Sequence, residues 1–330
     1  MCPLGKLNAC EAERLDIVAI GGGSGLSVLL RGLKGKDVNL TAVLTVGDDG
    51  GSSGRLRREL GLLPPGDFRS CIAALTDDEA LMTQLLQYRF GDGPLGGHAL
   101  GNLLLAAMAS VTGSFERAVL ETSRVLSIRG RIMPSTLEAV SVNAEMEARP
   151  DREGPRMVQG ESNVGEAGPG IRRVFLKPDA PFAYPGAVAA ILKARAILIG
   201  PGSLYTSVLP NLLVPGIRDA ILSSAAIKVY VCNIAAQKGE TEGYSVERHA
   251  RAIERHVGAG LFQYVLANNR WPPNRHVEYV RPQSDGSRGY ALVQADLVDE
   301  ERPWRHDSRK LGDALLRLVR REGPSVLAAC

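Results

Sequence analysis

The chain has 330 residues, of which 45% are hydrophobic and 23% are charged. This balance is typical of a globular α/β protein and excludes collagen, a coiled coil and an intrinsically disordered chain. The formal net charge of +3 gives no electrostatic reason to expect a nucleic acid or a membrane as partner. We therefore expect a folded protein with no nucleic-acid partner and no membrane span.

The cysteines and the apolar segments indicate a reduced, cytoplasmic protein. The five cysteines include no C-x-x-C pair, which argues against structural zinc and against a disulfide framework. No apolar run reaches the length of about 18 residues that a membrane span needs. Residues 1–14 carry charged side chains and no apolar signal-peptide core, and we interpret them as an N-terminal tail.

The first half of the chain predicts a repeated unit of strand, loop and helix. Residues 15–20 are a short apolar run, and a Gly/Ser loop follows at residues 21–25. Residues 38–46 are again apolar and β-branched, with a second Gly/Ser loop at residues 47–54. Two such units in succession indicate neighbouring parallel strands joined by a helix.

The middle of the chain changes character. Residues 68–126 have the spacing of helices, whereas residues 128–176 contain alternating segments and a stretch rich in Gly, Pro and charge. We interpret residues 128–176 as short antiparallel hairpins inserted between two α/β halves.

The α/β pattern returns after residue 185. A helix is expected at residues 186–193, and buried strands are expected at residues 196–199, 228–232 and 262–266. Residues 15–330 are therefore predicted to form one α/β domain. Its core is a mainly parallel sheet with helices on both faces and a small inserted β-hairpin region.

Three strand-to-helix turns rich in Gly and Ser are candidates for binding phosphate. The third comprises residues 200–207, and the carboxyl ends of parallel strands bring such turns to one edge. Unpaired backbone N–H groups and the positive end of a helix favour an anion there. A single such turn equally fits tight packing, but three of them favour a phosphorylated ligand.

The first loop departs from the common nucleotide-binding templates. A G-x-G-x-x-G fingerprint counted from Gly21 would need a small residue where Leu26 stands, and no Lys-Ser/Thr pair follows for a P-loop. A standard NAD dehydrogenase or P-loop NTPase is therefore disfavoured.

Charged side chains within and after the second loop extend this interpretation. Asp48 and Asp49 come just after a predicted strand. In nucleotide-binding folds an acidic residue at this position binds the ribose, and a pair of acidic residues could instead hold Mg²⁺ beside a diphosphate. The alternative is that the two residues only shape a solvated turn. Arg55 and Arg69 are candidate clamps, because a guanidinium can pair with two phosphate oxygens.

His98 and Asn102 are four residues apart and fall on one side of a predicted helix. They fit a ligand contact as well as they fit a satisfied polar pair in the core. No local pattern identifies a nucleophile, since residues 200–203 do not form a G-x-S-x-G elbow. The chemistry that the residues indicate is binding.

Six segments together resemble the gluconeogenesis-factor (YvcK-type) family of bacterial proteins. They occur in family order between residues 17 and 266: AIGGGSGL (19–26), VGDDGGSSGR (46–55), LPPGD (63–67), GHALGN (97–102), IGPGSLYTS (199–207) and GETEGY (239–244). The family shares a CofD-like superfamily with 2-phospho-L-lactate transferase, which moves phospholactate from a guanosine diphosphate ester onto a deazaflavin.

The resemblance implies a Rossmann-like core with a nucleotide across the Gly loops. For this branch it implies binding of UDP-sugars, notably UDP-N-acetylglucosamine. It also implies a role in cell shape and envelope synthesis during gluconeogenic growth, exerted through partner proteins rather than catalysis. We further expect a homo-oligomer.

The site residues that the resemblance implies fall on the three loops and on one strand end. The diphosphate would be lined by Gly22, Gly23, Ser24 and Gly25, and beside it would lie Asp48, Asp49, Ser52 and Ser53. The opposite wall would be closed by Gly202, Ser203 and Thr206, and Asn233 would contact the base or sugar. Two departures stand out. Ser24 replaces a usual Thr, and residues 235–238 replace a usual Met-Thr-Gln-Pro.

Three hypotheses follow for function. The first is a regulatory protein that binds a UDP-sugar without turnover. The second is a transferase acting on a nucleotide diphosphate ester, with Mg²⁺ at Asp48 or Asp49 neutralising the leaving diphosphate. The third is loose binding of NAD, which the failed fingerprint makes the weakest of the three.

Overall fold

The fold is built on a seven-stranded sheet whose paired strands are all parallel. In this computed structural model, residues 14–77, 79–147, 156–283 and 289–322 are described. The strands lie in the order β10-β9-β8-β7-β1-β2-β3. Their bounds are β1 (Leu15–Gly21), β2 (Val38–Leu44), β3 (Arg131–Pro134), β7 (Ala196–Ile199), β8 (Ile227–Val231), β9 (Tyr264–Asn268) and β10 (Ala291–Ala295).

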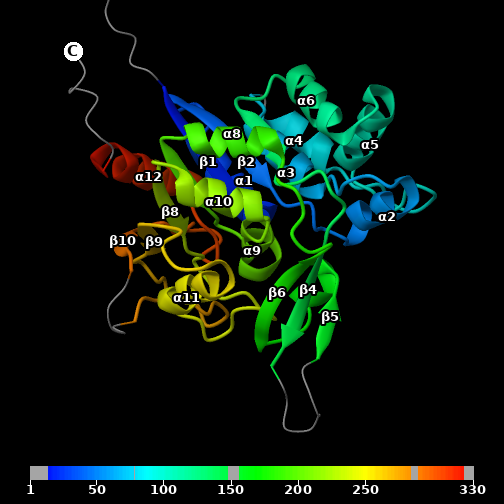
Figure 1. Ribbon diagram of the computed structural model, residues 1–330. Helices are drawn as coiled ribbons and strands as arrows, with labels where there is room; N and C mark the ends of the chain where they lie inside the picture. The colour runs from blue at the N-terminus through cyan, green and yellow to red at the C-terminus, as the bar shows by residue number, and fades with distance from the viewer. Residues whose placement is uncertain (1–13, 78, 148–155, 284–288, 323–330) are drawn as a thin grey trace, which may run out of the picture.

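Helices cover both faces of this sheet, and Figure 1 shows α8 and α10 crossing in front of the strands. The helices are α1 (Gly23–Leu33), α2 (Gly51–Leu60), α3 (Gly66–Leu75), α4 (Glu79–Gln87), α5 (Leu100–Thr112), α6 (Phe115–Val125), α7 (Glu161–Gly165), α8 (Pro185–Lys193), η1 (Leu204–Val208, a π-helix), α9 (Leu209–Leu212), α10 (Pro215–Ser223), α11 (Val246–Val257) and α12 (Ser308–Glu322).

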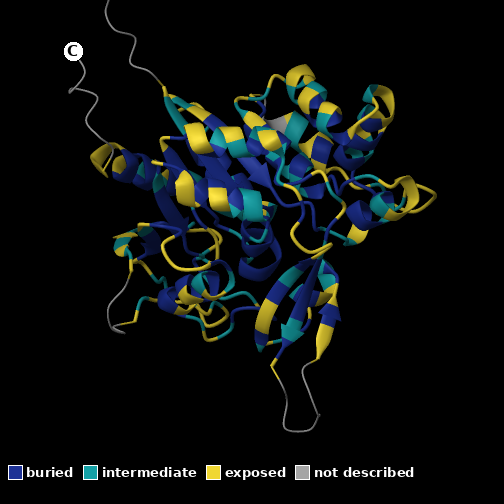
Figure 2. Ribbon diagram, in the orientation of Figure 1, coloured by how far each residue is buried: buried dark blue, intermediate teal, exposed yellow. Residues whose placement is uncertain are grey.

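The central strands are apolar because the two helical layers bury them on both sides. All four residues of β7 are fully buried, as are Ala19 and Ile20 of β1. Figure 2 shows this buried layer between helices whose outer faces are exposed. The predicted α/β class, with a parallel sheet between helices, is confirmed.

The topology creates a switch point between β1 and β7. From β1 the chain proceeds to β2 and β3 on one side, and from β7 it proceeds to β8, β9 and β10 on the other. Right-handed crossovers then place the helices of the two halves on opposite faces. In such sheets the crevice at the carboxyl ends of the two central strands is where ligands bind.

The insertion forms a separate antiparallel sheet. Its order is β5-β4-β6, from β4 (Ser141–Met146), β5 (Met157–Gln159) and β6 (Ile171–Lys177). The antiparallel strands were predicted, but residues 131–134 were expected within the insertion and instead form β3 beside β2. β3 lies at the edge of the sheet, where a proline such as Pro134 is tolerated, and its four residues are too few for a clear sequence pattern.

No single helix among the described residues is long and apolar enough to cross a membrane. Taken together, α5 and α6 have the length and composition of a membrane span, but the two helices are bent by 115° relative to each other.

We predict that Gly32→Ala destabilises the fold. A Cβ on Gly32 would overlap the backbone carbonyl of Ser308, because α1 and α12 cross at Gly32 and Gly312. Overpacking of this kind costs about 1–3 kcal/mol of unfolding free energy, measurable by urea unfolding. Gly91→Ala is the control, since a Cβ there meets nothing within 4 Å. Equal stability of the two variants would contradict the close crossing.

Candidate functional site

A cleft of about 380 Å³ lies at the switch point. The turns after β1, β7 and β8 form most of its walls, and a segment preceding α12 closes it. The lining residues are Gly22, Gly23, Ser24, Gly25, Val28, Pro201, Gly202, Ser203, Ser207, Asn233, Ile234, Ala235, Ala236, Gln237, Trp304, Arg305 and His306. Seven of the residues predicted from the sequence are therefore brought together in one cleft.

The turn after β1, which we call the first loop, leaves the start of α1 open to the cleft. The residue before this helix, Gly22, has no side chain to cap it, and the first turn carries no acidic residue. Among the described residues, only the first N–H, that of Gly23, is taken up, by the carboxyl of Asp67. Gly23 has φ +66°, a left-handed conformation that glycine adopts without strain. The Ser24 side chain is exposed and makes no hydrogen bond within the described residues. Backbone N–H groups and one hydroxyl are thus available to an anion.

The first loop touches the turn after β7, which we call the third loop. A Cβ on Gly25 would lie 2.8 Å from the carbonyl oxygen of Pro201 and 3.0 Å from Cα of Gly202. A Cβ on Gly202 would in turn lie 3.2 Å from the carbonyl oxygen of Gly22. Glycine at these positions is therefore needed for the two backbones to approach each other.

Two side chains fix the third loop. The Asn233 side chain accepts a hydrogen bond from N–H of Gly202 (3.2 Å) and donates one to its carbonyl (2.8 Å). Ser203 caps η1 and donates to the Glu240 carboxylate, with oxygen separations of 2.5 and 2.7 Å. Thr206, predicted to face the ligand, is buried beside Ser203 and does not line the cleft.

Acidic side chains lie behind the first loop. A Cβ on Gly22 would overlap the carboxylate of Asp67, which accepts a hydrogen bond from Gly23. Burial, followed by the charge of Asp48, raises the pKa of Asp67 to about 7. Burial and the charges of Asp48 and Asp67 raise the pKa of Glu161 to about 8. Near neutral pH these carboxyls carry protons that an ordinary carboxylate would have lost.

Asp48 and Asp49 have different surroundings. Asp48 accepts from N–H of Gly50 (2.9 Å), and burial raises its pKa. Asp49 accepts from the backbone N–H groups of Glu161 (3.1 Å) and Ser162 (3.0 Å), so it caps α7 and holds the insertion to the second loop, the turn after β2.

The described residues contain no group of three or more His, Cys, Asp or Glu side chains placed to hold a metal ion. Mg²⁺ commonly binds one or two carboxylates together with water and phosphate oxygens. Mg²⁺ at Asp48 or Asp49 therefore stays a prediction.

Four further predicted residues, Ser52, Arg55, His98 and Asn102, lie outside the cleft lining and make polar contacts around α2 and α5. Ser52 Oγ lies 3.1 Å from Nδ1 of His98 and accepts from the Asn102 amide (3.0 Å). Arg55 donates to the carbonyl of Gly96 (2.7 Å). Ser52, His98 and Asn102 are all buried.

Ser53 and Arg69 flank the acidic group. The Ser53 hydroxyl hydrogen bonds to Asp48, near the start of α3. The Arg69 guanidinium is electrostatically coupled to Asp67 and Asp48, and burial lowers its pKa. Its Nε has no hydrogen-bond partner within the described residues.

One wall of the cleft was not predicted from the sequence. Trp304, Arg305 and His306 belong to a loop that precedes α12, and His306 Nε2 lies 3.1 Å from the carbonyl oxygen of Cys232 at the end of β8. Burial lowers the pKa of His306 to about 4, so the ring is neutral and its N–H donates. No glycine turn or recognised motif marks this segment, although Trp304 and His306 are chemically distinctive.

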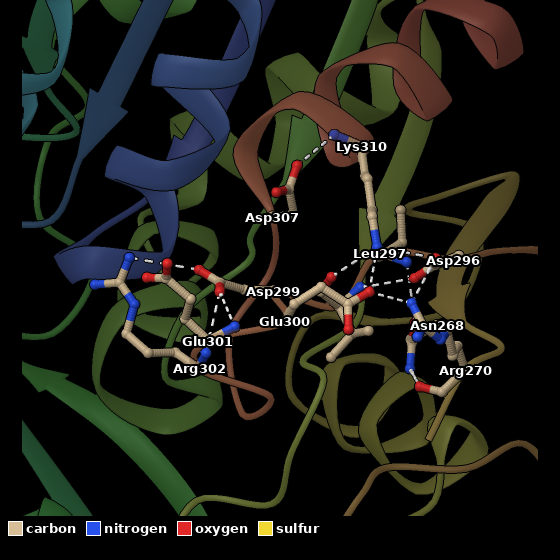
Figure 3. Close-up of polar contacts among 11 residues, drawn as sticks. Asn268, Arg270, Asp296, Leu297, Asp299, Glu300, Glu301, Arg302, Asp307 and Lys310 are labelled. Carbon is tan, nitrogen blue, oxygen red and sulfur yellow. Dashed lines mark hydrogen bonds and ion pairs between the residues drawn. The ribbon is translucent and has the colours of Figure 1, made fainter. Parts of the chain in front are cut away.

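A polar network anchors this loop (Figure 3). Lys310 Nζ contacts the carboxylate of Asp296 (2.9 Å) and the carbonyl of Val298 (3.0 Å). The Asn268 side chain accepts from N–H of Leu297 (3.0 Å), which connects the loop to the end of β9.

Arg305 is the one arginine or lysine lining the cleft in the described part of the chain. Its side chain makes no hydrogen bond or ion pair with the described residues, and the residue is exposed. The guanidinium can therefore pair with a ligand without first breaking an internal contact. Fold and site together define a Rossmann-like α/β protein with an amide-lined cleft at its topological switch point.

Comparison with known proteins gives the family. The CofD family, described as 2-phospho-L-lactate transferase CofD, matches residues 17–321. The gluconeogenesis factor of Bacillus subtilis (strain 168) is 45% identical over 320 residues, covering 93% of this chain and 99% of that protein. That of Halalkalibacterium halodurans is 51% identical over 294 residues, covering 88% and 86%.

A crystal structure of a UPF0052-family protein from Bacillus halodurans has a TM-score of 0.84 to this chain at 44% identity, covering 92% of this chain and 99% of that one. The chain belongs to the CofD family and is a homologue of the gluconeogenesis factors.

We predict that Asp67→Asn flattens the pH dependence of stability. Because the pKa of Asp67 is raised from 3.8 to about 7 in the folded chain, its contribution favours folding at low pH and is lost as pH rises through about 7. The amide keeps an oxygen acceptor for Gly23 but cannot ionise. Urea unfolding from about pH 5 to about pH 9 should therefore show a smaller fall in unfolding free energy for the variant.

Asp313→Asn is the control for this measurement. Asp313 is paired with Lys36, which lowers its pKa, so it stays ionised in both folded and unfolded chains across that range. An unchanged slope in Asp67→Asn would show that Asp67 does not titrate near neutrality.

Proposed function

We propose that the chain binds a nucleoside diphosphate sugar, UDP-N-acetylglucosamine in particular, and acts as a regulatory protein. The observation that carries this proposal is the convergence of the first and third loops with Arg305 on one cleft. Backbone N–H groups of α1 would receive the diphosphate, and residues 233–237 and 304–306 would enclose the sugar and the base.

The electrostatics of the cleft support an anionic ligand. Arg305 supplies one full positive charge, and the open end of α1 supplies a partial one. The carboxyls behind the first loop would repel a diphosphate if all were ionised, but their raised pKa values reduce that repulsion. Trp304, at 50% exposure, offers a ring face for stacking.

The residues outside the cleft lining would act on the ligand indirectly. We propose that Asp48 and Ser53 hold the start of α3 beneath the first loop, near the diphosphate. Ser52, His98 and Asn102 would fix the start of α2, with Arg55 holding the adjoining turn. Asp49 would attach the insertion, and Arg69 would offset the acidic charge.

The biological role is also a proposal. The similarity to gluconeogenesis factors supports a function during gluconeogenic growth. We place it in the cytoplasm, as a homo-oligomer that controls cell shape and envelope synthesis through a protein partner when the nucleotide sugar is bound.

A transferase acting on a nucleotide diphosphate ester is the second candidate. The description of the matching family favours it. Catalysis of such transfers rests mainly on positioning and charge stabilisation, so a site without a dedicated nucleophile is compatible with turnover.

Titration calorimetry with UDP-N-acetylglucosamine, GDP and NAD separates these functions. We expect the UDP-sugar to bind most tightly and to be recovered unchanged after incubation, as followed by phosphorus NMR. Tighter binding of NAD would contradict the proposal. Transfer from a guanosine diphosphate ester to a deazaflavin would establish the transferase instead.

Arg305→Ala should weaken binding of the UDP-sugar by about 10- to 100-fold, the loss expected for a hydrogen bond to a charged group. Arg302→Ala is the matched control, because Arg302 pairs with Asp299 at 3.4 Å and does not line the cleft. Equal loss in both variants would indicate that general charge, rather than a contact in the cleft, supports binding.

A further inference from the structure

A second pocket lies between α11 and the insertion. Its volume is about 160 Å³. Tyr205 of η1 and Tyr244 line it from the core, and Ile171 with Arg172 at the start of β6 lines it from the insertion. Tyr205 belongs to the same π-helix as Ser207, which lines the switch-point cleft, so η1 contributes to both.

Arginine dominates the walls of this pocket. Arg248, Arg251 and Arg255 project from one face of α11, because positions three and four apart lie on the same side of a helix. Arg172 adds a fourth guanidinium and pairs with Glu145, whose Oε1 lies 2.6 Å from Nη1.

Two of these arginines have no acidic partner among the described residues. Arg248 donates to the carbonyl of Gly243 (3.2 Å) and lies over the Tyr244 ring, 4.4 Å from its centre. Arg255 makes no hydrogen bond or ion pair with the described residues. Both guanidinium groups retain N–H donors for a ligand.

The other polar groups leave the positive charge in excess. Glu147 is the one acidic residue among the lining residues described. His256 adds no charge near neutral pH, since its Nε2 accepts from N–H of Val174 (3.0 Å) and its ring is largely buried. The Tyr205 and Tyr244 hydroxyls lie 2.8 Å apart, so one donates to the other and one proton is left for a ligand.

We propose that this pocket is a second anion site that binds a phosphate group, either free phosphate or the monoester of a small molecule. Guanidinium groups on opposite walls match the several oxygens of a phosphate, and a tyrosine hydroxyl completes the donor set. A volume of about 160 Å³ suits one phosphate group, whereas complete small-molecule sites span about 300–1,000 Å³.

The test uses the full chain carrying Arg305→Ala, so that binding at the switch-point cleft is weakened separately. Inorganic phosphate is titrated at constant ionic strength, with and without the further changes Arg248→Ala and Arg255→Ala. We expect phosphate to bind the parent, and the double change to weaken that binding at least about tenfold. Arg317→Ala with Arg320→Ala on α12 removes the same charge away from the pocket and should leave binding unchanged.

Equal loss in the control pair would show general charge attraction, and phosphate binding insensitive to Arg248 and Arg255 would place the ion elsewhere; either result overturns the proposal. Absence of phosphate binding in the parent, with glycerol 3-phosphate also failing, overturns it too. Tighter binding of glycerol 3-phosphate than of phosphate assigns the site to a monoester, and the reverse assigns it to free phosphate. Neither result depends on whether a UDP-sugar binds the cleft.

Discussion

Gly25 and Gly202 allow the backbone at the start of α1 to touch the backbone of the loop after β7. This contact spans the switch point, and every other part of the cleft is arranged around it. Any side chain at Gly25 would press on the Pro201 carbonyl and separate the loops. Parallel pairing of β1 with β7 brings the two turns to the same edge, but the lack of side chains lets them form one surface.

The first loop has weak positive charge on its cleft side, from Arg305 and the start of α1, and partly protonated carboxyl groups behind it. Asp67 and Glu161 come from different parts of the fold, α3 and α7, and both respond to the charge of Asp48. The insertion is therefore coupled to the core electrically through Glu161. It is also coupled structurally, through the Asp49 cap of α7 and the contact of His256 with Val174.

Much of the fold followed from local sequence patterns. Short apolar runs predicted β1, β2 and β7, each before a glycine turn, and β8, before Asn233, because strands buried on both faces leave such runs. These patterns did not predict β3. It has only four residues and lies at the edge of the sheet, so it has no apolar run long enough to be recognised in the sequence.

The lining of the cleft was predictable where backbone conformation demands glycine, as in the first and third loops. The roles of Asn233 and Asp49 were not, because both side chains bond to backbone groups that only the folded chain brings near. Arg305 was also missed. Its place in the cleft depends on contacts that His306 and Lys310 make with residues at the ends of strands. Such contacts between residues far apart in the chain cannot be predicted from local sequence spacing.

A crystal structure of the full chain with UDP-N-acetylglucosamine tests the central claim most directly. The account predicts diphosphate oxygens about 3 Å from the backbone nitrogens of Ser24 and Gly25, with the Arg305 guanidinium on the same group. A nucleotide sugar seated on another surface, or bound in the cleft with its diphosphate directed into solvent, would contradict it.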